Sequence, residues 1–335
     1  MAKVIRTYKG GSLSATCLMR NEDGKLFVRK SVSLIENREY GFQRWYSQLK
    51  RLQRYSALFP GLFPRVIRFG KDNEIAYFDI EYFESAINAQ EYIEQCQQDS
   101  EVDEFFISLI NIMSILHKTE IPSNAESMEL YLNEEIEQRL KDCSKNKAFI
   151  DFLKYEEILF NGTKAKPFLS VLDEYKILCK QCYVSPTETF THGNITLENM
   201  LYVVGEKRII LIDPYEENII DSVLAEYSQL LQSTNSKYEM YNCRNATVVD
   251  NKIVLTLPKS FGIEYLNEKI LQHIRNTYSQ NDYIVVRLLE ISQFIRMLPF
   301  KMAVDESKMI FFYGLASYLF ELLREEYIAL GGSEI

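Results

Sequence analysis

The chain has 335 residues, of which 25% are charged and 47% are hydrophobic, and its formal net charge is -9 at pH 7. This length suffices for two lobes, because a single hydrophobic core stops growing near ~250–300 residues. The acidic balance argues against a general nucleic-acid-binding protein, which needs clustered Lys and Arg on one face, and it favours a neutral or cationic small substrate.

Targeting and redox signals are weak in this chain. No segment has the order of a signal peptide, and no apolar run reaches the ~18–20 residues that span a bilayer, so we expect a cytoplasmic protein that does not bind membranes. Cys179 and Cys182 form a lone CxxC, which indicates two thiols on a helix rather than a zinc site. The sequon Asn161-Gly162-Thr163 matters only in a secreted chain, and we interpret it as chance.

The first part of the chain is rich in predicted strands. Residues 4–19 and 24–34 alternate in polarity around Asp23-Gly24, which predicts a hairpin. Residues 37–58 carry apolar and aromatic side chains at helical spacing, and Pro60 with Gly61 ends this helix. Residues 63–69 and 75–83 then predict two further strands, separated by the turn GKDN.

The second part of the chain is mainly helical. Helices are expected over residues 89–96, 104–119, 127–143, 166–182, 282–300 and 307–327. The only strand signals that we find here are LYVV, RIILID and a hairpin around ATVVDNKIVLTL. The pattern therefore predicts an α+β protein, with a small antiparallel-sheet lobe over residues 1–84 and a large helical lobe over residues 85–335.

One polar loop lies between two of these short strands. Residues 191–202 read THGNITLENMLY, and LIDPYE follows at 211–216. In this string His192, Gly193, Asn194, Asn199 and Asp213 have the offsets of the H-G-D-x-x-x-x-N loop and the following Asp of the aminoglycoside phosphotransferase and choline kinase family. The chain resembles this family of small-molecule kinases over roughly its whole length.

The resemblance implies a bilobal protein-kinase-like fold, a catalytic region over residues 191–214 and an acceptor that is a small hydroxylated molecule. Asn199 and Asp213 match the magnesium ligands of the family, and an amide oxygen with a carboxylate is a suitable pair for Mg²⁺ beside nucleotide phosphates. His192 usually hydrogen-bonds the backbone in this motif, so within the catalytic loop we assign it a positioning role and not proton transfer.

The first lobe supplies the expected site for ATP or GTP. Lys30 matches the family's phosphate-binding lysine, with Arg29 as its rival because adjacent strand residues point to opposite faces. The resemblance also assigns the glycine-containing loop over the phosphates to Gly10, Gly11, Ser12 and Ser14. Glu39 is the expected ion-pair partner of the lysine. The linker that contacts the base is expected at Glu81, Tyr82 and Phe83.

Asn194 stands where the family has an aspartate base. An amide has no basic lone pair at neutral pH, so Asn194 can orient a substrate hydroxyl but cannot accept its proton. The chain is then a slow or unusual phosphotransferase, a nucleotide-binding pseudokinase, a protein with an engineered Asp-to-Asn change, or a kinase-fold scaffold without catalysis. Because Lys30, Asn199 and Asp213 are all present, we favour a phosphotransferase.

Downstream segments resemble a subset of these proteins that is found among bacterial surface-polysaccharide genes. The resemblance is carried by DPYEENIIDSVLAEYSQLLQS and EISQFIRMLPFK. Glu290 and Arg296 in the second segment either contact substrate or form structural ion pairs, and ion pairs are the commoner role. A sugar, polyol, amino alcohol or aminoglycoside would each offer the acceptor hydroxyl.

Overall fold

The computed structural model describes residues 2–8, 14–35, 38–124, 126–184, 187–215 and 218–332, with the backbone alone at residues 14 and 38–40. The chain divides into two compact units. The first unit comprises residues 1–92, 107–116 and 192–218, and the second comprises residues 93–106, 117–191 and 219–335. The region that carries the HGN loop and Asp213 therefore belongs to the same unit as the N-terminal strands.

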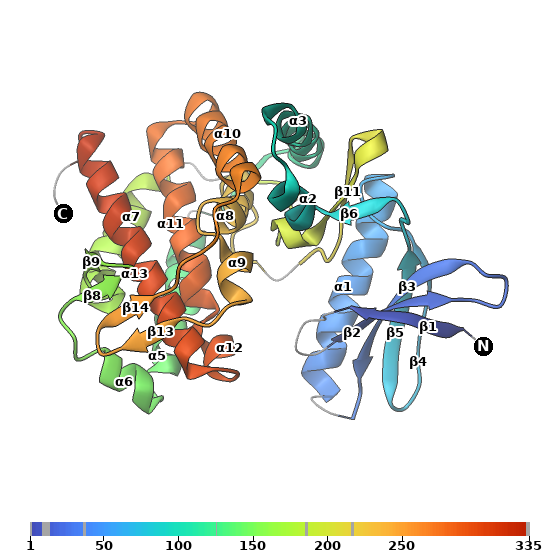
Figure 1. Cartoon of the computed structure of the whole chain (residues 1–335), viewed down its shortest axis with the longest axis horizontal. Helices are drawn as coiled ribbons and strands as arrows, with labels where there is room; N and C mark the ends of the chain where they lie inside the picture. The colour runs from blue at the N-terminus through green and yellow to red at the C-terminus, as the bar shows by residue number, and fades with distance from the viewer. Residues whose placement is uncertain are drawn as a thin grey trace. The chain divides into compact units, whose positions relative to one another are not determined.

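A five-stranded antiparallel sheet forms the first part of unit 1 (Figure 1). Its order is β1-β2-β3-β5-β4, and every neighbouring pair is antiparallel. The strands are β1 (Lys3–Tyr8), β2 (Ser14–Arg20), β3 (Leu26–Ser33), β4 (Val66–Lys71) and β5 (Ile75–Glu81). The hairpin predicted around Asp23-Gly24 is present, and the two strands predicted around the turn GKDN pair as β4 and β5. The φ angle of 82° at Gly24 suits the turn between β2 and β3.

Helix α1 (Arg38–Leu58) packs on this sheet through the apolar stripe that its sequence predicts. Trp45, Leu49 and Leu52 on this stripe are all buried. Gly41 brings the start of α1 close to β3, because a Cβ atom at this position would lie 3.1 Å from the Val32 side chain.

A three-stranded sheet in the same unit carries the polar loop. Its order is β12-β11-β6, with β6 (Ala86–Asn88), β11 (Met200–Val203) and β12 (Arg208–Leu211). The 3₁₀ helices η3 (Leu197–Asn199) and η4 (Val204–Glu206) flank β11. Tyr202, Ile209 and Ile210 are fully buried, so the strand after the HGN turn and the strand before Asp213 are both anchored in a core.

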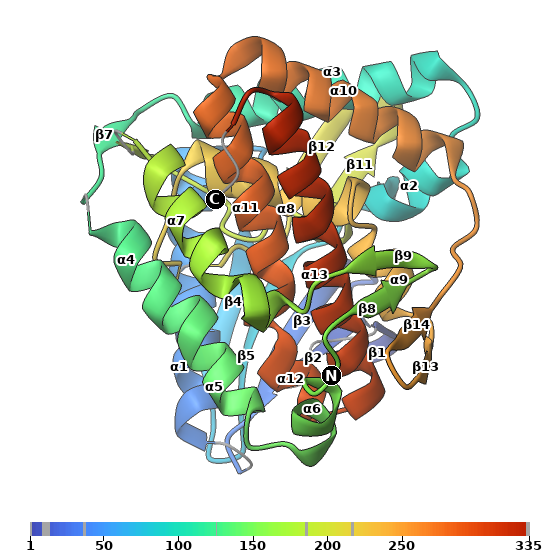
Figure 2. The ribbon, with the colours of Figure 1, turned by 90° about the vertical axis from the view of Figure 1, so that its left-hand side faces the viewer.

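Unit 2 is mainly helical, and α7, α11 and α13 lie side by side (Figure 2). Its centre is α11, in which every residue from Tyr283 to Ile295 is buried. Helices α7, α8 and α13 contact α11. The elements of this unit, with α2 and α3 shared between the units, are α2 (Ala89–Gln95), α3 (Asp99–Leu116), β7 (Ile121–Pro122), α4 (Ser127–Tyr131), η1 (Leu132–Glu137), α5 (Gln138–Cys143), α6 (Lys147–Phe152), η2 (Phe168–Val171), α7 (Leu172–Cys182), β10 (Thr187–Glu188), α8 (Val223–Thr234), α9 (Tyr238–Asn242), α10 (Phe261–Thr277), α11 (Gln280–Arg296), α12 (Leu298–Met302) and α13 (Glu306–Ala329).

Unit 2 contains a second hairpin, whose two strands were not predicted from the sequence. β8 (Ile158–Phe160) and β9 (Thr163–Ala165) pair beside β14 (Lys252–Val254) and β13 (Thr247–Val249). The turn is Asn161-Gly162, with φ angles of 49° and 86°. Two positive φ angles are typical of a type I′ turn, for which Asn-Gly is the preferred pair. The dipeptide that we interpreted as a chance sequon is therefore a hairpin signal.

The CxxC cysteines and two of the histidines are packing residues. Cys179 and Cys182 are buried in α7, and burial raises the pKa of the Cys179 thiol to about 12. His117 lies 3.2 Å from the Glu226 carboxylate, and His273 lies 2.9 Å from the Tyr227 hydroxyl. Burial lowers the pKa of His273. Among the residues that the structure describes, no helix is both long enough and apolar enough to cross a membrane.

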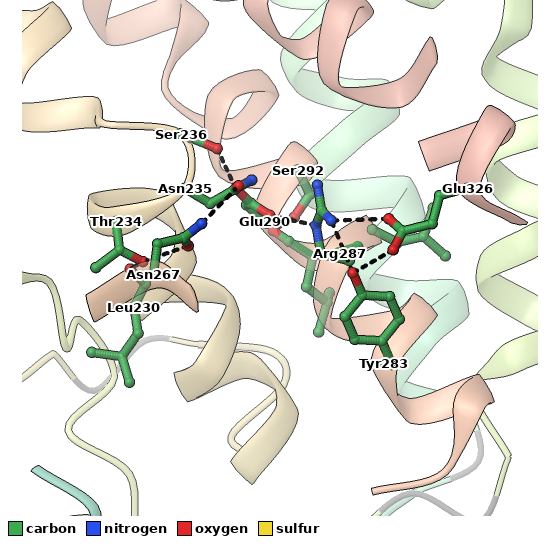
Figure 3. A network of polar contacts seen from close by, with 12 residues as sticks. Leu230, Thr234, Asn235, Ser236, Asn267, Tyr283, Arg287, Glu290, Ser292 and Glu326 are labelled. Carbon is green, nitrogen blue, oxygen red and sulfur yellow. Dashed lines mark hydrogen bonds and ion pairs between the residues drawn. The ribbon is translucent and has the colours of Figure 1, made fainter. Parts of the chain in front are cut away.

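A buried ionic network holds α11 to its neighbours (Figure 3). The Glu290 carboxylate is fully buried and accepts hydrogen bonds from Arg287 Nε at 2.9 Å and Asn235 Nδ2 at 2.8 Å. The Ser236 hydroxyl also donates to it. Arg287 in turn contacts Glu326 of α13 at 3.1 Å. Every charge in this network has a partner, which is the condition for burying charges in a protein core.

We expect Arg287→Met to lower the free energy of unfolding by about 3–5 kcal/mol, because Glu290 would become a buried carboxylate without its cation. Lys147→Met is the matched control, since the Lys147 side chain is 88% exposed and solvent screens its ion pair with Asp151, so its loss should hardly change stability. Denaturant unfolding followed by circular dichroism measures both. Equal losses in the two variants would contradict the role given to the network.

Candidate active site

His192 is the centre of the polar loop and is completely buried. Its Nε2 lies 2.8 Å from the carbonyl oxygen of Ile212, and its Nδ1 accepts the backbone N–H of Asn194 at 3.3 Å. A carbonyl can only accept and a backbone N–H can only donate, so these partners specify the neutral imidazole with its proton on Nε2. Both ring nitrogens are therefore occupied, and His192 positions the loop.

Gly193 is required at its position for two reasons. Its φ angle is 80°, in a region that L side chains rarely adopt. A Cβ atom there would also lie 2.2 Å from the carbonyl oxygen of Tyr215 and 2.7 Å from Asn218 Nδ2. The segment after Asp213 packs directly against the HGN turn, and only glycine allows this approach.

Asn199 directs its side-chain oxygen away from the loop. Its Nδ2 group donates to the carbonyl oxygen of Asn194 at 3.0 Å and to the Thr196 hydroxyl at 3.1 Å. These two bonds use both amide hydrogens, so Oδ1 is the group that remains for a cation. Because Asn199 is buried, its orientation is fixed before any ligand arrives.

Asp213 follows β12 in a left-handed backbone conformation, with a φ angle of 58°. The residue before it, Ile212, is held by its N–H bond to the carbonyl oxygen of Asn199 at 2.9 Å and by its own carbonyl bond to His192. The Asp213 carboxylate pairs with the ammonium group of Lys30. The structure thus brings together the predicted lysine and the predicted metal-binding aspartate within unit 1.

The geometry of β3 gives Lys30 and Arg29 different partners. Lys30 is buried on the face that carries Val28 and Val32, whereas Arg29 projects from the opposite face. There Arg29 makes two hydrogen bonds to the buried Asp79, at 2.7 and 2.9 Å, and Arg68 contacts the same carboxylate. Arg29 is therefore a structural residue of the sheet.

Asn194 itself is exposed, and only its backbone atoms hold the loop. Its N–H donates to His192, and its carbonyl oxygen accepts from Thr196 and Asn199. In the described part of the chain its side chain makes no hydrogen bond, so the amide contributes nothing to the shape of the turn. A change of this side chain alters the chemistry of the loop and leaves its scaffold intact.

The linker keeps only part of its backbone free for a base. The N–H of Glu81 donates to Arg65 at 3.1 Å, and the carbonyl oxygen of Phe83 accepts from Ala86 at 3.2 Å. The hydrogen bond from Arg65 also holds the pKa of the Glu81 carboxyl below its usual value. Of the predicted contacts, the backbone of Tyr82 and the N–H of Phe83 are the groups without such bonds among the described residues.

Several predicted residues lie outside the described residues. These are Gly10, Gly11 and Ser12 of the glycine-containing loop, together with the side chains of Ser14 and Glu39. Their assignments stay predictions. The described residues contain no cluster of three or more His, Cys, Asp or Glu side chains that would hold a metal ion.

The donor set nevertheless fits magnesium. Mg²⁺ prefers oxygen ligands and is usually bound by one or two protein groups, with phosphates and water completing its shell. The amide oxygen of Asn199 and the carboxylate of Asp213 are such groups, and both are tied to the same hydrogen-bonded loop. Two protein ligands are therefore enough, and a larger cluster is not needed.

Two supporting residues were missed by the sequence analysis. Asn218 Nδ2 donates to the carbonyl oxygen of Gly193 at 2.9 Å. The Phe63 ring stacks on the His192 imidazole, with centroids 6.0 Å apart and an interplanar angle of 10°. Neither residue belongs to a motif, and Phe63 is far from His192 in the sequence, so no signal short of the structure indicates them.

Glu290 and Arg296 form separate structural ion pairs, as the commoner interpretation of the sequence expected. Glu290 pairs with Arg287 and Arg296 pairs with Glu135, each at 2.9 Å. The carboxylates of Glu290 and Glu135 are therefore both engaged in ion pairs.

Comparison with known proteins supports the fold. No protein-family profile matches the sequence, and no curated protein matches it either. The structure is similar to the crystal structure of a "putative fructosamine-3-kinase" from Haemophilus somnus 129PT, with a TM-score of 0.55 and 11% sequence identity over 95% of this chain and 92% of that chain. At this identity the likeness shows the fold alone.

The α+β kinase-like fold predicted from the sequence is therefore confirmed, and it is a fold used by small-molecule kinases. The narrower resemblance to the aminoglycoside phosphotransferase and choline kinase family stays a prediction, as do the individual site assignments.

We expect Gly193→Ala to distort the HGN turn and to lower the melting temperature, since the strain of a positive φ angle alone costs about 1–3 kcal/mol. Gly205→Ala is the control, because a Cβ atom there would meet nothing within 4 Å. Differential scanning calorimetry compares the two variants. A Gly193→Ala protein as stable as the Gly205→Ala protein would show that the close approach of Tyr215 is not needed.

Proposed function

We propose that this protein is an ATP- or GTP-dependent phosphotransferase that acts on a hydroxyl group of a small molecule. The observation that carries the proposal is the meeting of Lys30 and Asp213 beside a loop that presents the Asn199 oxygen. A cation, a carboxylate and an amide oxygen are the groups that bind nucleotide phosphates and their metal in kinases. A purely structural role explains less simply why these three groups meet in one compact unit.

Each residue has a role in this proposal. Lys30 binds nucleotide phosphates, while Asn199 and Asp213 hold the metal. Magnesium, when bound, neutralises charge on the phosphates. The direct pair between Lys30 and Asp213 holds the two groups close to each other until a nucleotide binds. The backbone of Tyr82 and Phe83 is the proposed contact for the purine.

Asn194 then orients the acceptor hydroxyl without removing its proton. Phosphoryl transfer depends chiefly on positioning and charge neutralisation, and a general base typically adds ~10²–10⁴-fold. The proposal is therefore a slow enzyme, or an enzyme whose acceptor is already acidic. The structural neighbour is named for a fructosamine, so sugars that bear an amine belong in the first substrate pool with polyols, amino alcohols and aminoglycosides.

We expect binding of Mg²⁺ with ATP or GTP, and we expect Lys30→Met and Asp213→Asn each to weaken it by at least about 10-fold through loss of a charged phosphate or metal contact. Lys25→Met, in the exposed turn after β2, is the control for loss of a positive charge. Isothermal titration calorimetry with each nucleotide measures the affinities.

No heat and no thermal shift at millimolar nucleotide with Mg²⁺ would refute the phosphotransferase and pseudokinase interpretations together. A kinase-fold scaffold would then be the better interpretation.

Restoring a carboxylate with Asn194→Asp should raise turnover by roughly 10²-fold or more with a suitable acceptor, the usual contribution of a positioned base. Stability should hardly change, because the Asn194 side chain is exposed and makes no hydrogen bond among the described residues. A nucleotide-consumption screen over pooled hydroxylated metabolites measures the gain, and Asn194→Asp combined with Asp213→Asn should lose it. Intact nucleotide binding without transfer in any pool would favour a pseudokinase.

A further inference from the structure

The negative net charge of the chain conceals a strong asymmetry. Residues 1–92 contain 15 Lys and Arg but 10 Asp and Glu, for a net charge of +5. The other 243 residues contain 23 Lys and Arg but 37 Asp and Glu, for a net charge of -14. Asymmetry of this size between two parts of one chain indicates surfaces with opposite electrostatic preferences.

The exposed face of α1 carries part of this positive charge without acidic residues between its cations. Residues 41–58 contain no acidic residue, and three of their seven exposed side chains, Arg44, Lys50 and Arg54, are cationic. In the part of the chain that the structure describes, Arg44 and Lys50 form no ion pair. A solvated helix face usually alternates charge at i,i+4, whereas Lys50 and Arg54 are like charges at this spacing.

Aromatic rings of α1 hold two lysines beside this face. The Lys71 ammonium lies 4.9 Å from the centroid of the Phe42 ring. Phe42 stacks on Tyr46 at 6.1 Å, and the Lys50 ammonium lies 5.3 Å from the Tyr46 ring. We call Lys71, Phe42, Tyr46, Lys50 and Arg54 the α1 row. Cations held over rings lose less conformational freedom on binding than cations on free side chains.

We propose that the α1 row is a docking surface for an acidic segment of a protein partner. The row spans about 18 Å from Phe42 to Arg54 at the helical rise of ~1.5 Å per residue, which an extended segment of about five or six residues would cover. Carboxylates along such a segment meet the cations of residues 41–58, a stretch that contains no acidic residue, together with Lys71. Charge complementarity identifies the partner.

Two other anionic partners fit the row less well. A membrane-bound helix inserts an apolar face, but the apolar face of α1, with Trp45, Leu49 and Leu52, is buried against the sheet. Single-stranded nucleic acid binds by stacking its bases on exposed rings. Phe42 and Tyr46 stack on each other and each has an ammonium group near its ring, so a base would have to displace these contacts in order to stack.

The experiment measures binding of a fluorescein-labelled octaglutamate peptide to the whole chain by fluorescence anisotropy, at low and at high salt. We expect binding at low salt that weakens as salt is added, because exposed charges are screened. Reversing two charges with Lys50→Glu and Lys71→Glu should weaken binding by at least about 10-fold. Tyr46→Ala should weaken it by only a few-fold, since this change frees the lysine without removing its charge.

The matched control is Lys3→Glu with Arg20→Glu, an exposed cross-strand pair of β1 and β2 in the same unit. It changes the net charge equally and should leave peptide binding within about 2-fold, as expected for charges outside the interface. If charge reversal impairs folding, Lys50→Gln with Lys71→Gln replaces it, and circular dichroism verifies the helix.

Four outcomes would overturn the proposal. The first is no peptide binding at low salt, and the second is an equal loss of binding in the α1 and control variants. The third is tighter binding of an oligouridylate or of phosphatidylserine vesicles, if the α1 variants abolish that binding. The fourth is salt-dependent self-association through the row, measured by analytical ultracentrifugation.

Discussion

The site depends on the two hydrogen bonds of the buried His192 imidazole. One joins the loop to the end of β12 through the Ile212 carbonyl group, and the other closes the HGN turn through the Asn194 N–H. A neutral ring satisfies both, whereas a charged ring would lose one acceptor and bury a charge. The positions of Asn199 and Asp213 follow, because each lies one hydrogen-bonded step from these two contacts.

Sequence spacing predicted the parts of this arrangement that local geometry determines. The offsets from His192 to Asn199 reflect one tight turn and one short helix, and the alternation of β3 limits the lysine to one of two neighbours. The choice of Lys30 needed the position of Asp79, which neutralises Arg29 on the other face. The choice between the two residues depends on the pairing of β3 with β5. These strands are far apart in the sequence, so no local sequence pattern reveals the pairing.

The parts that could not be predicted are contacts between distant segments. Phe63 stacks on His192, and Asn218 supports Gly193, although neither has a motif. Asn161-Gly162 is a different case, because its turn signal is local and strong but the tripeptide was interpreted only as a chance sequon. In the four-stranded sheet that contains this turn, β8 pairs in parallel with β14, and only long-range packing specifies that pairing.

Asn194 and the α1 row show that the local structure of a site can differ from what its motif or the net charge of the chain suggests. The loop uses the backbone of Asn194 and leaves its side chain exposed, so the fold tolerates an amide where a carboxylate is usual in kinases. Net charge is similarly non-local. Screening limits the reach of exposed charges to about 8 Å at physiological salt, so a cationic row on α1 acts on a partner largely independently of distant acidic residues. An acidic chain can therefore carry a surface that binds acidic segments, and only the distribution of its charges shows this.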